Sequence, residues 1–125
     1  MRALTVDDSK LVRRLVARTL GDLGFEVDEA ADGQEALWNL FKKGAADLVI
    51  LDWNMPVVDG LEFLKRMRKR DDFAEIKVIM LTARNEQQSV VEAVQSGADE
   101  YVMKPFSREA LEEKVRMVMG LEEPQ

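Results

Sequence analysis

The sequence predicts an α/β protein in which helices cover both faces of a five-stranded parallel sheet. The first observation is that five short, β-prone apolar runs alternate with segments of helical spacing, joined by short links. The second is that two of these runs are apolar without alternation, which is typical of strands covered on both faces. The predicted strands are Arg2–Val6, Phe25–Ala30, Asp47–Leu51, Ile76–Leu81 and Glu100–Met103.

Between the predicted strands, apolar residues recur at the three- and four-residue spacing of amphipathic helices. The five apolar stripes fall within Leu11–Leu20, Ala36–Phe41, Leu61–Met67, Val90–Val94 and Leu111–Met119. Residues that favour helix ends support these boundaries. Ser9 and Ser107 stand at expected N-caps, and Gly24, Gly44 and Gly97 stand at expected C-terminal ends.

The composition restricts the possible chemistry. The 125 residues include no cysteine and no histidine, which excludes thiol catalysis, a Ser–His–Asp triad and zinc sites built from Cys or His. A bound metal must therefore take oxygen ligands, which favours Mg²⁺, Mn²⁺ or Ca²⁺. The net charge of −6 opposes nucleic acid binding.

The length fits one domain, which we expect over residues 1–120, followed by a C-terminal tail over residues 121–125. The chain has neither an apolar tract long enough to span a bilayer nor the apolar core of a signal peptide. We therefore expect no membrane insertion, and a cytoplasmic location fits the absence of cysteine.

Acidic residues follow two of the predicted strands. Asp7 and Asp8 come after the first strand and Asp52 after the third, while Thr82 follows the fourth and Lys104 the fifth. In the flavodoxin-like strand order 2-1-3-4-5, the first and third strands are neighbours, and ligands bind beyond their carboxyl ends. This fold therefore predicts that the three carboxylates converge in one pocket.

Three carboxylates in one pocket repel each other unless a cation lies between them. Mg²⁺ suits such a site because it accepts one or two carboxylates and leaves positions for phosphate oxygens. A carboxylate beside it, such as Asp52, is a plausible nucleophile for phosphoryl transfer. Thr82 and Lys104 could then contact the oxygens of the transferred group.

Each of these residues also has a simpler interpretation. Asp7 and Asp8 could be an N-cap and a first-turn acid of the following helix. Thr82 taken alone is a loop or capping residue, and Lys104 taken alone is a solvated charge. Asp59 and Gly60 are interpreted as a turn before the third helix, without a metal role.

Four motifs in register resemble the response-regulator receiver family, and most closely its single-domain chemotaxis members. The resemblance covers essentially the whole chain. The motifs are Val6-Asp7-Asp8-Ser9, Asp52-Trp53-Asn54-Met55-Pro56 with Asp59-Gly60, Leu81-Thr82-Ala83, and Tyr101-Val102-Met103-Lys104-Pro105-Phe106.

The resemblance implies a role for each site residue. Asp52 would be the phosphoacceptor, and Mg²⁺ (or Mn²⁺ in its place) would be held by the carboxylates of Asp8 and Asp52. The main-chain carbonyl of Asn54 would complete the protein ligands, with Asp7 acting through water. The phosphoryl group would contact Thr82, Ala83 and Lys104, and the Lys104–Pro105 peptide bond would be cis.

The resemblance also implies a two-component signalling switch without turnover of an external substrate. A histidine kinase, a phosphotransfer protein or a small acyl phosphate would donate the phosphoryl group. Thr82 would then shift, Tyr101 would move inward, and a downstream protein would bind the surface formed by the fourth helix, fifth strand and fifth helix, at residues 86–119. Arg84 departs from the chemotaxis regulator of enteric type, which has an acid there; with Asn54, this position would influence hydrolysis of the phosphoryl group.

Proteins of other classes fit the sequence less well. An Asp-nucleophile phosphohydrolase would have its nucleophile in an Asp-x-Asp element early in the chain, whereas here Asp52 is followed by Trp53-Asn54. A flavin-binding module of the same fold would need a phosphate loop where the sequence has Asp7-Asp8. A receiver domain cut from a longer regulator would have the same sequence features. The basic run at residues 65–70 is interpreted as a solvated helix face and not as a nucleic-acid patch.

Overall fold

A computed structural model describes residues 1–121 as a five-stranded parallel sheet in the order β2-β1-β3-β4-β5. This confirms the predicted fold class and strand order. The predicted tail, apart from Leu121, lies outside the described residues. The strands are β1 (Arg2–Val6), β2 (Glu26–Ala30), β3 (Leu48–Leu51), β4 (Lys77–Thr82) and β5 (Glu100–Met103).

The bounds of β2, β3 and β4 differ from the prediction by one residue, and the difference in β4 concerns the site. Thr82 is the last residue of β4 and pairs with Met103 of β5, whereas the sequence placed it just after the strand. In a sequence, a polar residue at the end of a strand is easily interpreted as the start of a loop, although its main chain still pairs with the neighbouring strand. As a result, Thr82 is fixed by the sheet itself.

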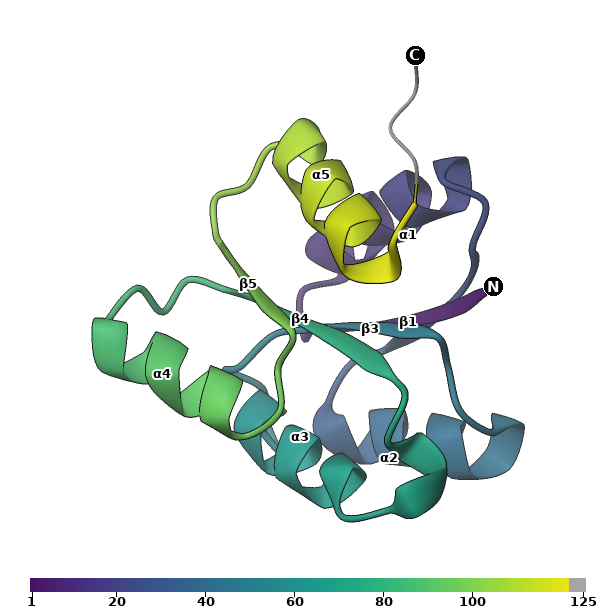
Figure 1. Cartoon of the computed structure of the whole chain (residues 1–125), viewed down its shortest axis with the longest axis vertical. Coiled ribbons are helices and arrows are strands. Elements are labelled where there is room, and N and C mark those ends of the chain that lie inside the picture. The colour runs from purple at the N-terminus through teal and green to yellow at the C-terminus, as the bar shows by residue number, and fades with distance from the viewer. Residues whose placement is uncertain (122–125) are drawn as a thin grey trace.

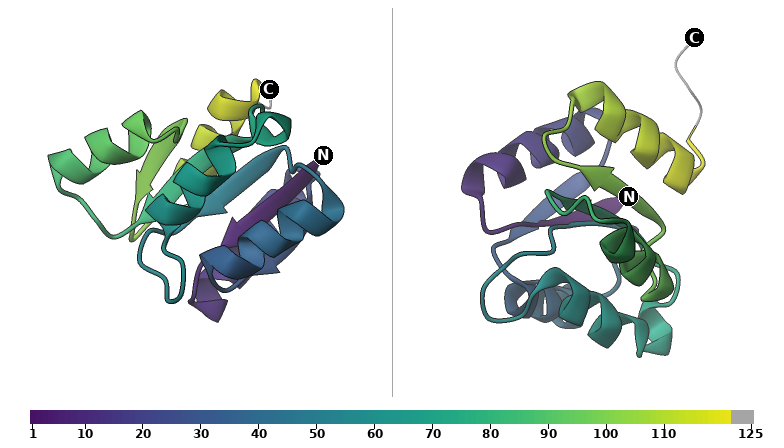
Figure 2. Two further views of the ribbon diagram at one scale, coloured as in Figure 1. Left: turned by 90° about the horizontal axis from the view of Figure 1, so that it is seen from below. Right: turned by 90° about the vertical axis from the view of Figure 1, so that its left-hand side faces the viewer.

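Helices lie in two layers, one on each face of the sheet (Figures 1 and 2). The helices α1 (Lys10–Asp22) and α5 (Arg108–Met119) cover one face. The other face is covered by α2 (Gly33–Lys43), α3 (Gly60–Arg68) and α4 (Gln87–Gln95), with a short 3₁₀ turn, η1 (Asp71–Phe73), after α3. None of the helices within residues 1–121 is both long and apolar enough to cross a bilayer.

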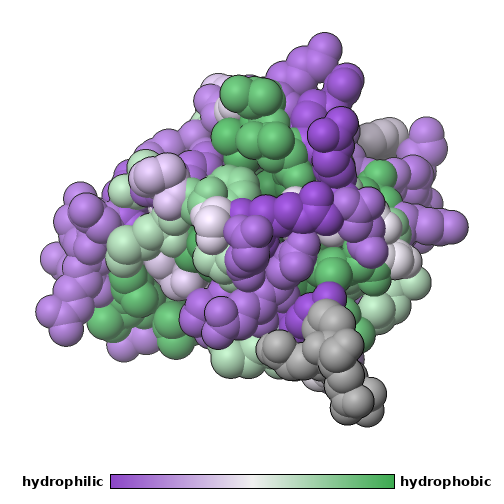
Figure 3. Space-filling model, turned by 90° about the horizontal axis from the view of Figure 1, so that it is seen from above, coloured by the Kyte–Doolittle hydropathy of each residue, from purple (hydrophilic) through white to green (hydrophobic). Residues whose placement is uncertain are grey.

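The core divides into two clusters because the central strands are buried on both faces. All four residues of β3 are buried, and Val49 and Leu51 face one cluster while Leu48 and Ile50 face the other. The uninterrupted apolar run is therefore a strand buried on both faces, as predicted. The outer side of the α1–α5 layer mixes apolar and hydrophilic side chains (Figure 3).

The helix ends follow the expected caps. The Ser9 hydroxyl accepts a hydrogen bond from the Val12 N–H, and the Ser107 hydroxyl accepts one from the Ala110 N–H. Gly44 ends α2 with a φ of 86°. Gly24 and Gly97 also have positive φ, each one residue beyond the helix C-cap.

The basic run at residues 65–70 begins on the outer side of α3. Lys65 and Arg66 are exposed, whereas Met67 is buried in the core. Arg66 forms an ion pair of 2.9 Å with Glu62, and Arg68 donates a hydrogen bond of 2.9 Å to the Gly97 carbonyl. Lys65 and Arg66 therefore lie on a solvated helix face, as predicted, whereas Lys69 and Arg70 follow the end of α3 at Arg68.

One backbone conformation in the β3–α3 loop is strained. Val57 has a φ of 67°, a left-handed conformation that is an outlier for a β-branched residue, and its side chain is 75% exposed. Nothing in the packing of so exposed a side chain offsets the strain, which we place at about 1 kcal/mol.

We expect Val57→Asn to raise the free energy of unfolding by about 1 kcal/mol, because Asn tolerates this conformation better than Val. Urea unfolding at equilibrium measures the change. Val91→Asn, at an exposed helical position of α4, is the matched control and should bring no gain. A Val57→Asn variant no more stable than the native chain would show that the strain is not released.

Candidate metal and phosphoryl site

The three predicted carboxylates meet at the carboxyl ends of β1 and β3. One carboxylate oxygen from each of Asp7, Asp8 and Asp52 lies within 4.8 Å of the other two. Asp7 and Asp52 are buried, with 2% and 6% of their surface exposed, whereas Asp8 is exposed. The predicted convergence is confirmed, and the cluster has one side open to solvent.

The loop between β1 and α1 holds Asp7 in place. One carboxylate oxygen of Asp7 accepts a hydrogen bond of 2.9 Å from the Ser9 N–H, and the Asp7 carbonyl accepts one of 2.7 Å from Arg13. Ser9 is the N-cap of α1, and the first turn of α1 contains no acid. The capping interpretation of Asp7 and Asp8 is therefore wrong.

Asp52 has two carboxylate oxygens in different surroundings. Oδ1 accepts a hydrogen bond of 2.8 Å from the Trp53 N–H, and Oδ2 lies 3.5 Å from Nζ of Lys104. The Asp52 N–H donates to the Val6 carbonyl, which ties the residue to β1. The main chain therefore sets both the position and the rotation of this carboxylate.

Lys104 reaches the cluster from the end of β5. Its Nζ lies 2.7 Å from Oδ2 of Asp7, closer than to Asp52. The main-chain N–H of Lys104 donates a hydrogen bond to the Thr82 carbonyl. The peptide bond from Lys104 to Pro105 is cis, as the resemblance implied. One ammonium group faces three carboxylates, so the cluster keeps an excess of negative charge.

The Asp52 carboxyl has a pKa raised above its ordinary value of 3.8. Burial is the largest cause, because it disfavours the charged form, and the charge of Asp7 acts in the same direction. Lys104, the Thr82 hydroxyl and the Trp53 N–H oppose the shift and lower the pKa. The ionised cluster is thus held at a net electrostatic disadvantage.

The side-chain chemistry of this cluster fits a hard divalent cation. All candidate side-chain ligands are carboxylate oxygens, and the sequence has no Cys or His to attract softer metals. Mg²⁺ uses few protein carboxylates and keeps several waters, which suits a cluster with one exposed member. A divalent charge would also offset the repulsion that raises the pKa of Asp52.

Arg84 lies over one side of the site. Its guanidinium donates hydrogen bonds of 3.1 and 3.0 Å to Oδ1 of Asn54, and it stacks 4.6 Å above the Trp53 ring. The Arg84 N–H lies 3.4 Å from the fully buried Thr82 hydroxyl. Arg84 therefore links the β3–α3 loop to the end of β4.

Tyr101 is joined to the same arrangement through the main chain. Its hydroxyl donates a hydrogen bond of 2.7 Å to the Arg84 carbonyl, and its ring is half-buried against the core. Burial is the main cause that raises the pKa of the phenol. Ala83, between Thr82 and Arg84, is exposed. Thr82, Arg84 and Tyr101 thus form one connected set.

Two glycines that the sequence interpretation did not assign to the site allow close packing of the β3–α3 loop, which follows Asp52. A Cβ at Gly60 would lie 2.1 Å from the Asp52 carbonyl oxygen, and a Cβ at Gly33 would lie 2.5 Å from the Val58 carbonyl oxygen. The N–H of Gly60 donates to the Trp53 carbonyl. The interpretation of Asp59-Gly60 as a turn is correct, since Asp59 caps α3, but incomplete, because only glycine lets α3 approach Asp52 so closely.

Comparison with known proteins shows similarity to one family. The family model of the response regulator receiver domain matches residues 3–116. The chain is 40% identical to chemotaxis protein CheY1 of Helicobacter pylori over 121 residues, which covers 96% of this chain and 98% of the relative. It is 41% identical to chemotaxis protein CheY-3 of Vibrio cholerae over 116 residues, covering 92% and 88% of the two chains.

Solved structures agree as well. Chemotaxis response regulator CheY4 of Vibrio cholerae has a TM-score of 0.87 at 38% identity, covering 94% of this chain and 97% of that one. CheY in the CheX-CheY-BeF₃-Mg²⁺ complex from Borrelia burgdorferi has a TM-score of 0.87 at 30% identity, covering 94% and 88%.

The chain therefore belongs to the response regulator receiver domain family. Within that family it is CheY-like, a phosphoacceptor of two-component signalling with an acidic site at Asp7, Asp8 and Asp52. It is a signalling protein and not an enzyme that turns over an external substrate, which excludes the phosphohydrolase alternative.

Without metal, ionisation of Asp52 should destabilise the fold. Because its pKa is raised in the folded state, its contribution to stability is greatest below the unfolded value and falls as the pH rises through the folded value. At neutral pH in a chelating buffer, we expect Asp52→Asn to raise the free energy of unfolding by about 1 kcal/mol.

The gain should shrink as the pH is lowered through the raised pKa of Asp52, because the native carboxyl then becomes protonated. Chemical denaturation at several pH values measures it, with Asp71→Asn at an exposed position as the control. A variant less stable than the native chain at neutral pH would refute the assignment of Asp52 as an electrostatically unfavourable group.

Proposed function

We propose that Asp52 is the residue that receives the phosphoryl group, with Mg²⁺ bound beside it and Mn²⁺ able to substitute. The observation that carries this proposal is the meeting of three carboxylates within 4.8 Å, next to the ammonium of Lys104. Asp8 and Asp52 hold the ion through carboxylate oxygens and Asn54 through its main-chain carbonyl, while Asp7 acts through water. When bound, the ion neutralises the carboxylates and the incoming phosphoryl oxygens.

In the transfer step, a carboxylate oxygen of Asp52 attacks the phosphorus of the donor. A new oxygen–phosphorus bond forms while the bond from phosphorus to the donor breaks, and the donor keeps that electron pair. Lys104, 3.5 Å from Asp52, and the buried hydroxyl of Thr82 contact the phosphoryl oxygens, together with the main chain at Ala83. Positioning and charge neutralisation account for most of the catalytic acceleration of such a transfer.

The donor is a separate molecule, because this chain has no histidine. A sensor histidine kinase or a phosphotransfer protein supplies the phosphoryl group, and a small acyl phosphate can replace it. The Borrelia burgdorferi relative, crystallised with BeF₃ and Mg²⁺, supports an anion beside a divalent ion in this fold. In its chemistry, BeF₃ stands in for a phosphoryl group. A cytoplasmic location of this chain suits phosphorylation by such a kinase.

Phosphorylation changes the positions of Thr82, Arg84 and Tyr101, which are connected by hydrogen bonds. The added group brings nearly two negative charges, which draw the Thr82 hydroxyl toward Asp52. Thr82 accepts a hydrogen bond from Arg84, whose carbonyl accepts one from Tyr101, so the movement reaches the Tyr101 ring. A downstream protein then recognises the α4–β5–α5 surface, and the relatives favour chemotaxis as the pathway.

Arg84 and Asn54 set the lifetime of the phosphorylated state. The Arg84 guanidinium is bound to Asn54 and stacked on Trp53, so the two side chains stand together beside the site and control the access of water to the phosphorus. A cation there also stabilises the phosphoryl charge.

The signalling unit is the receiver domain over residues 1–120.

The direct test is incubation with acetyl phosphate and Mg²⁺, followed by the mass of the intact protein. We expect one addition of about 80 Da per chain, dependent on the divalent ion. Asp52→Asn should remove this addition, whereas Asp59→Asn, which alters only the α3 cap, should retain it. An equal addition in Asp52→Asn would refute Asp52 as the phosphoacceptor.

A further inference from the structure

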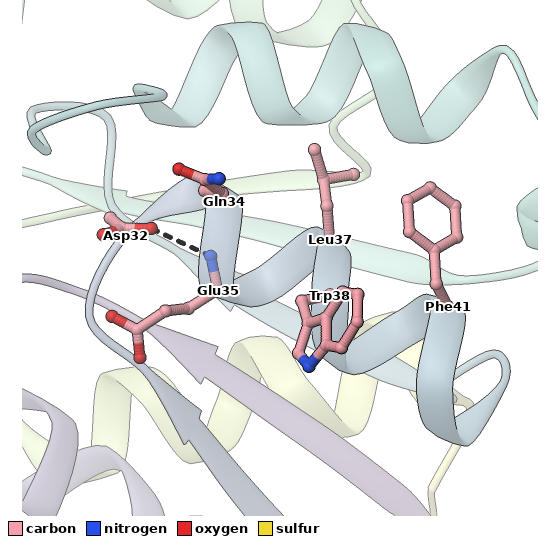
Figure 4. Close-up of a pocket in the computed structure, with 6 residues that line it drawn as sticks. All are labelled: Asp32, Gln34, Glu35, Leu37, Trp38 and Phe41. Atoms are coloured by element: carbon pink, nitrogen blue, oxygen red, sulfur yellow. Dashed lines mark hydrogen bonds between the residues drawn. The ribbon is translucent and has the colours of Figure 1, made fainter.

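The outer side of α2 carries aromatic side chains that the phosphoacceptor site does not use. Trp38 is 67% exposed and Phe41 is 52% exposed, with Leu37 half-buried beside them. Figure 4 shows Leu37 and Phe41 pointing to one side of the helix and Trp38 pointing to the other. A single exposed apolar residue is ordinary, but a Trp next to a Phe is the composition of an interface centre.

Trp38 stands as a ridge between two hollows. The larger hollow, of about 430 Å³, lies on the side of Leu37 and Phe41 (Figure 4). The smaller one, of about 260 Å³, lies on the side of Asn39 and Lys43. Trp38 and Glu35 line both. A ridge flanked by two hollows can interlock with a second surface of the same shape.

The charges on this side of α2 are arranged with opposite sign at its two ends. Glu35 lies in the first turn and Lys42 in the last, and with Trp38 they share one face at helical spacing. Both are exposed, and neither has an ion pair within the described part of the chain. Lys43, in contrast, already binds Asp28 at 3.0 Å.

We propose that this face, formed by Glu35, Trp38, Phe41 and Lys42, binds the same face of a second copy of the chain. Trp38 is at the middle of α2, which runs from Gly33 to Lys43. A two-fold axis that passes near Trp38, perpendicular to α2, makes the two helices antiparallel, so that Glu35 of each copy meets Lys42 of the other. This is an isologous contact, in which one surface is its own complement.

The contact is small, so the association is weak. An 11-residue helix is about 16 Å long, and a stable dimer buries about 800 Å² on each partner. The face lies on a different helix from the α4–β5–α5 surface, which stays free in the dimer. The proposal does not depend on phosphorylation of Asp52.

Sedimentation velocity from about 10 µM to about 1 mM tests the proposal. The native chain should shift from monomer toward dimer over this range, and Trp38→Ala should remain monomeric. Leu11→Ala is the matched control, because Leu11 is 70% exposed on α1, on the opposite face of the sheet, and its loss should leave the dimer intact.

Charge exchange tests the antiparallel arrangement. Glu35→Lys and Lys42→Glu should each abolish the dimer, because each brings like charges together, and the two combined should restore it. Circular dichroism checks that every variant is folded. A native chain that stays monomeric at about 1 mM, self-association of Trp38→Ala, or a double variant that remains monomeric would each overturn the proposal.

Discussion

The structure depends on keeping together three carboxylates that repel one another. Main-chain hydrogen bonds to Asp7 and Asp52, and the packing of β1 beside β3, hold these acids against that repulsion. Lys104 supplies one positive charge, bound more closely to Asp7 than to Asp52. The folded chain therefore keeps unfavourable charge repulsion at this site, which a divalent ion relieves. The hydrogen bonds that link Thr82 to Arg84 and Tyr101 begin beside the same site.

Much of this arrangement could be predicted from sequence, because its determinants are periodic or local. The apolar runs at Leu48–Leu51 and Val78–Leu81 indicated buried parallel strands, and this fold brings the ends of the first and third strands together. The convergence of Asp7, Asp8 and Asp52 then followed from topology alone. The caps at Ser9 and Ser107 depend only on neighbouring residues and were also predictable.

The features that the sequence did not reveal depend on contacts between distant segments. The need for glycine at Gly60 comes from its approach to the Asp52 carbonyl, which no local pattern encodes. The stacking of Arg84 on Trp53 joins residues that follow different strands. The exposure of Trp38 is another example, because tryptophan is highly buried on average and only the packing of α2 shows this one to be exposed. The left-handed conformation of Val57 runs against the preference of that residue.

The central claim, that these three acids share one cation, is tested most directly by calorimetric titration with Mg²⁺. We expect one ion per chain, and a loss of affinity of about tenfold or more in Asp8→Asn and in Asp52→Asn. Glu113→Gln, which removes an exposed acid on α5, should bind as the native chain does. Unchanged binding in Asp8→Asn, or a native chain that binds no Mg²⁺, would contradict it.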